Sequence, residues 1–133
     1  MPPSGHVPVQ IVAELGIDFE VYPLAAYEFV HRGLVYTVNR IYGPPKHPPV
    51  SRHVTGQQLC HGLRELATGQ WGFLAETVLR RWNITSTMDF GRIVFSLARQ
   101  KVMSTTPQDS IEDFRGVFDF TKAFESNYHI ASK

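Results

Sequence analysis

Four prolines within twelve residues divide this chain into two parts. They lie in the stretch GPPKHPPVSRHV, residues 43 to 54. Proline fixes φ and has no amide hydrogen to donate, so the stretch can form neither a helix nor a central strand. We therefore predict a stiff, extended connector. It is locally basic, which makes Lys46 and Arg52 a candidate contact arm for an acidic partner. The alternative is a solvated linker that binds nothing.

Residues 1 to 42, on the N-terminal side of this connector, are predicted to be helical. One helix is expected after Pro8, and a longer one from about Leu24 to Tyr42, where Gly43 ends it. Apolar residues recur in the longer segment in steps of three and four, as they do on one face of a helix. They are Tyr27, Val30, Leu34, Val38 and Ile41.

Three further helices are expected after the connector. Thr55 and Gln58 have the spacing of a capping box, in which each side chain bonds an amide left free at the start of a helix. A second helix is expected from about Gly72. Ser86 or Thr87 can cap the third. The apolar face of this third helix is formed by Phe90, Ile93, Val94 and Leu97.

Two short runs near the C-terminus suggest strands. KVMS (101–104) and GVFDF (116–120) favour β-structure, and the polar segment TTPQDSIEDFR separates them, so we predict a β-hairpin. The predicted fold class is therefore mainly α with a small β-hairpin (α+β). Residues 55–124 would form a winged-helix-like half, preceded by the N-terminal helices and followed by a tail over 125–133. All of these would belong to a single domain, 1–133.

Composition narrows the functional classes. Hydrophobic residues make up 43% and charged residues 19% of the 133, as in a globular domain. The formal net charge is only +1, whereas DNA-binding domains are usually strongly basic. No secretory signal and no run of 18 apolar residues is apparent, and the single cysteine cannot form an internal disulfide. A cytoplasmic protein that does not associate with membranes is expected.

The third predicted helix after the connector also presents a candidate binding surface. At 100° per residue, the side opposite its apolar face carries Met88, Arg92, Phe95 and Arg99. Arginine, methionine and aromatic residues are enriched at protein interfaces. The same side would enter a DNA groove if the domain bound as winged helices do. The alternative is that another element covers Phe95.

The charges favour a protein partner over nucleic acid. The loop of the predicted hairpin carries Asp109, Glu112 and Asp113, which would lie beside phosphates in a DNA complex. We therefore predict a non-enzymatic protein–protein interaction or adaptor module, with self-association included among its modes. Nucleic-acid binding is the alternative.

No motif for catalysis, a cofactor or a metal is found. His47, His53, Cys60 and His61 are close in sequence, but they lack the spacing of a zinc site, and Cys60 belongs to an apolar helix face. The acidic residues of the loop lack the order of a calcium loop. We predict no cofactor and no metal. A small enzyme without a recognisable motif is the second alternative, because catalytic groups converge in space rather than in sequence.

Three stretches together resemble a small family found mostly in Planctomycetes and Verrucomicrobia. They are TGQQLCHGLRELA, WGFLAETVLRRWNITSTMDFGRIVFSL and DSIEDFRGVFDFTKAF, and the similarity runs from about Ala25 to Phe124. The proline-rich stretch and the N-terminal dozen residues fit the family less well. The resemblance implies a bacterial protein but no particular activity, cofactor or site residue, because the family has no established activity.

Overall fold

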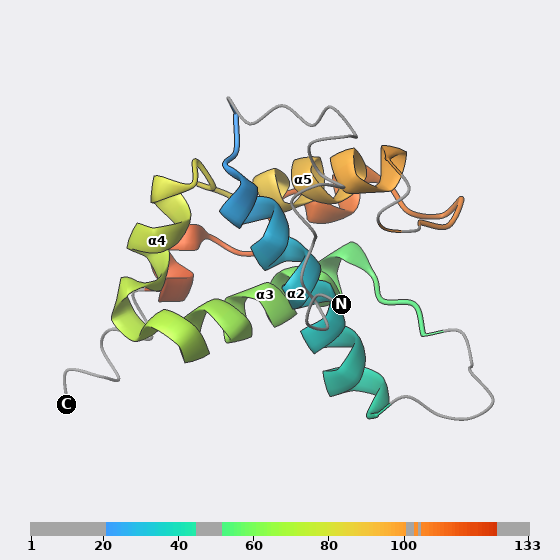
Figure 1. Cartoon of the computed structure of the whole chain (residues 1–133), viewed down its shortest axis with the longest axis horizontal. Coiled ribbons are helices and arrows are strands. Elements are labelled where there is room, and N and C mark those ends of the chain that lie inside the picture. The colour runs from blue at the N-terminus through green and yellow to red at the C-terminus, as the bar shows by residue number, and fades with distance from the viewer. Residues whose placement is uncertain (1–20, 45–51, 101–102, 104, 125–133) are drawn as a thin grey trace.

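A computed structural model of the chain describes residues 21–44, 52–100, 103 and 105–124. These residues form a helical assembly (Figure 1). Its elements, in chain order, are α2 (Leu24–Tyr42), α3 (Gly56–Trp71), the 3-10 helix η1 (Gly72–Leu74), α4 (Ala75–Arg81), α5 (Thr87–Arg99) and the 3-10 helix η2 (Ile111–Phe114). The helix expected after Pro8 and the tail over 125–133 lie outside the described residues.

The predicted bounds of α2 and the predicted start of α3 are confirmed, whereas α4 begins at Ala75, after the 3-10 helix η1 that starts at the predicted Gly72. The long helix runs from Leu24 to Tyr42, and the amide of Gly43 donates to the Asn39 carbonyl at its end. The capping box at α3 is present: Gln58 N donates to Thr55 Oγ1 (3.1 Å) and Thr55 N donates to Gln58 Oε1 (2.8 Å). These signals act over three or four residues, so they can be recognised without the tertiary structure.

Two glycines allow α2 and α3 to cross closely. A Cβ added at Gly62 would lie 1.8 Å from Thr37 Oγ1, and one added at Gly33 would lie 2.0 Å from Leu63 Cδ2. Thr37 is buried and donates from Oγ1 to the Gly33 carbonyl (2.7 Å). We call this a closed crossing, because the two helices are in direct contact and any side chain at Gly62 would have to displace a buried, hydrogen-bonded threonine.

The core lies where α5 packs against this helix pair. Its largest fully buried side chains come from all four α-helices and from the turn before α5. They include Phe29, Leu63, Leu79, Ile84, Phe90, Ile93 and Leu97. The predicted apolar face of α5 is thus confirmed as the buried one. None of the described helices combines the length and the apolar character that crossing a membrane requires.

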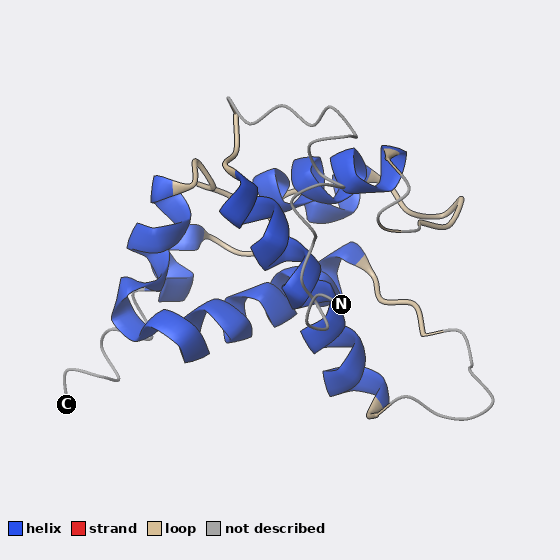
Figure 2. Cartoon of the chain, viewed as in Figure 1, coloured by secondary structure: helices blue, strands red, loops and turns tan. Residues whose placement is uncertain are grey.

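The predicted β-hairpin is wrong. Figure 2 shows helices and loops but no strand in the part of the chain that the structure describes. Within the segment expected to be the loop, Ser110 begins η2: its Oγ accepts from Glu112 N (3.1 Å), and Asp113 accepts from Ser110 N (3.0 Å). Of the first expected strand, residues 101, 102 and 104 lie outside the described residues.

The second expected strand leads into a helical turn instead. Asp119 accepts from the amide of Lys122 (2.9 Å), and residues 120–124 are helical. The aromatic residues that suggested a strand pack on one another, with Phe118 stacked on Phe120 at a 5.8 Å ring separation. The mainly α prediction holds for the described residues, but without a wing the winged-helix (α+β) fold class is contradicted.

Candidate functional site

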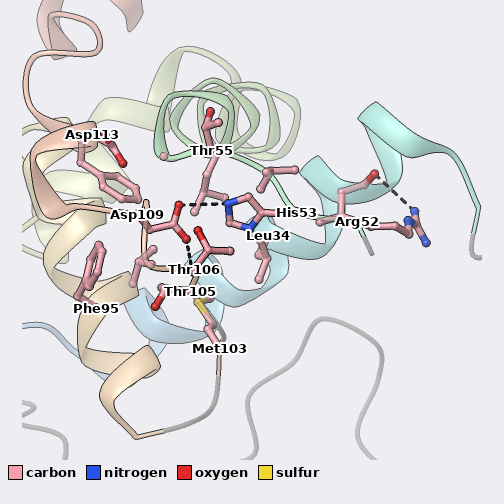
Figure 3. A pocket seen from close by; sticks show the side chains of 16 residues that line it. Leu34, Arg52, His53, Thr55, Phe95, Met103, Thr105, Thr106, Asp109 and Asp113 are labelled. Carbon is pink, nitrogen blue, oxygen red and sulfur yellow. Dashed lines mark hydrogen bonds and ion pairs between the residues drawn. The ribbon is translucent and has the colours of Figure 1, made fainter. Parts of the chain in front are cut away.

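An open cavity of about 290 Å³ lies between α2, the start of α3, α5 and the segment that includes η2. Figure 3 shows the side chains that line it. Its size is near the lower end of the range for ligand pockets in proteins. Most of its wall is apolar. The apolar lining consists of Leu34, Val38, Val54, Leu59, Val94, Phe95, Met103 and Phe114.

One wall of the cavity is held by Phe114 of η2. A Cβ at Gly91 of α5 would lie 2.8 Å from the Phe114 side chain, and one at Gly56 of α3 would lie 2.9 Å from it. Because neither position has a side chain, Phe114 packs directly on both helices. Thr87 Oγ1 donates to the Phe114 carbonyl (2.5 Å) and accepts from Val117 N (3.2 Å). These contacts attach η2 to the start of α5 and fix that wall.

A histidine–aspartate pair closes one edge of the cavity mouth. His53 Nε2 lies 3.1 Å from Asp109 Oδ1, and the amide of Thr106 donates to Asp109 Oδ2 (2.6 Å). The His53 side chain is 40% exposed and that of Asp109 is 17% exposed. The pair joins the connector to the loop before η2, and Asp113 also lines the mouth (Figure 3).

Arg52 lines the cavity with part of its side chain, but its charged guanidinium group bonds to the end of α2. Its guanidinium donates to Asn39 Oδ1 (3.0 Å) and to the carbonyl of Gly43, at the C-terminal end of α2. It also lies 6.0 Å from the centre of the Tyr42 ring. A cation suits the free carbonyls at a helix C-terminus. Of the predicted contact arm, Arg52 is therefore bound to α2, and Lys46 lies outside the described residues.

The structure brings one residue of the predicted binding surface to the cavity. Phe95 is half-buried, lies in the cavity wall and meets the Phe114 ring edge to face, with ring centres 6.3 Å apart. Met88, half-buried in the first turn of α5, does not line the cavity. Arg92 and Arg99 are exposed and also lie outside its wall.

Arg92 belongs to a hydrogen-bonded network around Asp89 at the start of α5. Asp89 Oδ1 accepts from Tyr22 Oη (2.5 Å) and from Arg92 Nη1 (2.7 Å), while Oδ2 accepts from the amides of Thr85 and Ser86. Burial opposes ionisation, but these hydrogen bonds outweigh it and lower the pKa of Asp89 below its ordinary value. Burial and the Asp89 hydrogen bond raise the pKa of Tyr22 to about 12.

The residues considered for metal binding do not converge. Cys60 is fully buried in the core, and burial raises the pKa of its thiol to about 12, so it is protonated at neutral pH. His61 is exposed and packs against the Phe118 ring (5.7 Å), and His47 lies outside the described residues. Within the described ranges, no group of three or more His, Cys, Asp or Glu side chains could hold a metal ion.

His53 and Asp109 are the polar partners that sequence reasoning did not connect. They are 56 residues apart, and no local pattern links them. A histidine oriented by a carboxylate can serve as a general base when it also contacts a nucleophile. Among the described residues no hydroxyl or thiol bonds to the imidazole ring of His53, although Tyr42 Oη donates to the His53 backbone carbonyl (2.5 Å). The pair joins the connector to the loop before η2.

Comparison with known proteins adds no further assignment. No family model, curated protein or solved structure matched the chain.

Proposed function

We propose that the protein is a non-enzymatic interaction module that binds a partner protein by receiving an apolar side chain in the cavity beside α5. The observation that supports this most strongly is the cavity itself, which is open to solvent and has a largely apolar wall. Binding pockets in proteins are typically concave and mostly apolar, and this cavity has both properties. It suits an external side chain.

The energetics of such docking are favourable. Burying a Leu or Phe side chain contributes about 1.5–3 kcal/mol, because apolar surface is removed from water. Binding energy at interfaces is concentrated on a few such anchors in well-shaped pockets. Phe95 extends the apolar wall of the cavity toward the exposed side of α5, which continues with Arg99. The anchor would thus sit beside residue types that are common at interfaces.

The charges around the cavity support a protein partner rather than nucleic acid. The two carboxylates at its mouth, Asp109 and Asp113, would repel phosphates. The arginine that lines the cavity in the described residues, Arg52, is already engaged at the end of α2. Nucleic-acid binding needs cations that are free to neutralise phosphates, so we place it second.

Filling the cavity tests the proposal. Val38 is half-buried and lines the cavity from α2, so Val38→Trp would place an indole in the space meant for the partner. Ile41→Trp adds the same group on the same helix at an exposed position outside the cavity wall. A partner captured from nuclease-treated lysate by the original protein and by Ile41→Trp, but not by Val38→Trp, is expected. Equal capture by all three would refute docking in this cavity.

A further inference from the structure

The charge at the cavity mouth indicates what kind of segment docks there. Asp109 and Asp113 both line the cavity. Within the described part of the chain Asp109 pairs only with His53, and Asp113 makes no ion pair. The one arginine in the cavity lining, Arg52, directs its guanidinium to the end of α2 (Figure 3). Among the described residues, therefore, neither of these two carboxylates has a Lys or Arg partner.

These carboxylates retain hydrogen-bonding capacity. Each carboxylate oxygen can accept about two hydrogen bonds. Asp109 accepts one bond on each oxygen, from His53 Nε2 and from Thr106 N, and Asp113 accepts from Ser110 N through Oδ2. Free positions thus remain on both side chains, beside an apolar space.

Docking would lower the hydration of the two carboxylates, and this costs free energy unless the partner supplies a cation. A segment laid across the mouth removes water from the carboxylates, and an unpaired charge loses hydration free energy when water is excluded. A neutral apolar segment would leave that loss uncompensated, and an acidic one would add repulsion. A cation would offset it with charge-assisted hydrogen bonds, which are about twice as strong as neutral ones.

We propose, on the basis of the function proposed above, that the docked segment is a basic peptide of the partner. It inserts an apolar side chain into the cavity and places a flanking Lys or Arg against Asp109 and Asp113. The apolar anchor supplies affinity, and the flanking cation selects against neutral and acidic segments that carry the same anchor.

A peptide selection tests this with defined ligands. The full chain is used to select binders from a library of random displayed peptides, and only binders that lose affinity for Val38→Trp are kept. The strongest of these are synthesised, and their Kd values are measured by fluorescence anisotropy. The protein variants compared are Asp109→Asn, Asp113→Asn and Glu112→Gln. Thermal melts confirm that each variant is folded.

Glu112→Gln is the matched control. It also removes one negative charge from η2, but Glu112 lies outside the cavity wall and pairs with Arg115 (2.5 Å). Each asparagine keeps a carbonyl oxygen that can accept the backbone amide bonded by the aspartate it replaces. We expect Lys or Arg beside the apolar anchor in the selected peptides. We also expect binding to be about tenfold weaker for each Asp→Asn variant, and changed less than about twofold for Glu112→Gln.

The outcomes separate the two proposals. Peptides that need the open cavity but show no enrichment in Lys or Arg would overturn the basic-segment inference and leave the proposed function standing. The same holds if such peptides bind both Asp→Asn variants as tightly as the original protein. If no selected peptide is sensitive to Val38→Trp, docking in the cavity is wrong, and the inference fails with it.

Discussion

Of two adjacent faces of α2, one is packed closely against another helix and the other borders open space. On one, Gly33 and Thr37 meet α3 so closely that a single added carbon at Gly62 would overlap the threonine hydroxyl. On the other, one residue further along, Leu34 and Val38 border an open cavity. The same helix pair thus contains a closed crossing and an open space within one turn of each other.

The difference shows what each face contributes. At the closed crossing, glycine allows direct contact of the helices, and the buried threonine satisfies its own hydroxyl within α2. At the open face, the loop before η2 spans the gap through the His53–Asp109 pair and does not fill it. The closed crossing fixes the positions of α2 and α3, and these positions define the shape of the cavity. Substitutions in the cavity lining can therefore alter binding with little loss of stability, whereas substitutions at the crossing would alter both.

The largest loss of folding stability is expected from Gly62→Ala. Its Cβ would lie 1.8 Å from Thr37 Oγ1 and 2.8 Å from Thr37 Cβ, so the helices must separate or the buried threonine must move. We expect a loss of about 3 kcal/mol in the free energy of unfolding, measured by urea denaturation. Gly69→Ala on the same helix meets nothing within 4 Å and should instead stabilise by about 0.5–1 kcal/mol. Similar results for both variants would disprove the close crossing.

Asp89→Asn should have the next largest effect, because Asp89 is a buried carboxylate whereas Asp109 lies at the open mouth. Losing its charge weakens hydrogen bonds from Tyr22, Arg92 and two amides, and we expect a cost of about 2–3 kcal/mol at pH 7. Asp109→Asn should cost less than about 1 kcal/mol.

The pH dependence of this difference follows from the lowered pKa of Asp89. Its stabilising contribution is fully present above the ordinary pKa of 3.8 and is lost as the pH falls through the lower pKa of the folded state. The stability gap between the original protein and Asp89→Asn should therefore be constant from pH 7 to about pH 5 and narrow in more acidic solution. A gap that widens on acidification would contradict the network.

Phe95→Ala should have a smaller effect on folding than on binding. The ring is only half-buried, so we expect a cost of about 1–2 kcal/mol, below the 3–5 kcal/mol typical of a fully buried phenylalanine. Binding of a cavity-dependent peptide should weaken by at least about tenfold, because a wall of the cavity is removed. Thermal melts and anisotropy titrations on the same sample separate the two effects. Unchanged binding would exclude Phe95 from the docking surface.

The smallest effect on folding is expected from Val38→Trp, although it adds far more atoms than Gly62→Ala. The indole would enter space that is already open, so the free energy of unfolding should change by less than about 1 kcal/mol. A loss comparable to that of Gly62→Ala, measured by the same urea titration, would show that the cavity is closed in solution.

The structural features that depend on residues close together in the chain were predicted correctly from the sequence. The bounds of α2, the Thr55–Gln58 box and the buried face of α5 all follow from patterns within a few turns. The region after α5 was mispredicted because its aromatic residues fit a strand pattern, whereas the caps at Ser110 and Asp119 direct the backbone into helical turns. This segment does contain a local signal for η2, because Ser110 and Asp113 have the three-residue spacing of a capping box.

The candidate site was only partly predictable. Phe95 was identified from helix periodicity, but its place in a cavity wall depends on Phe114, which packs on α5 at Gly91 and on α3 at Gly56, both distant from it in the sequence. The pairing of His53 with Asp109 likewise depends on how the connector and the loop before η2 approach each other. Such contacts arise from tertiary packing, and local spacing contains no signal for them.

Docking of a partner in the cavity can be tested by NMR mapping of a bound ligand. The labelled full chain is titrated with the strongest binder selected from an unbiased peptide library, and changes in amide and methyl signals are located. We expect the largest changes on the cavity lining, at Leu59, Val94 and Phe95. Changes centred on Arg92 and Arg99, with the cavity signals unmoved, would contradict it.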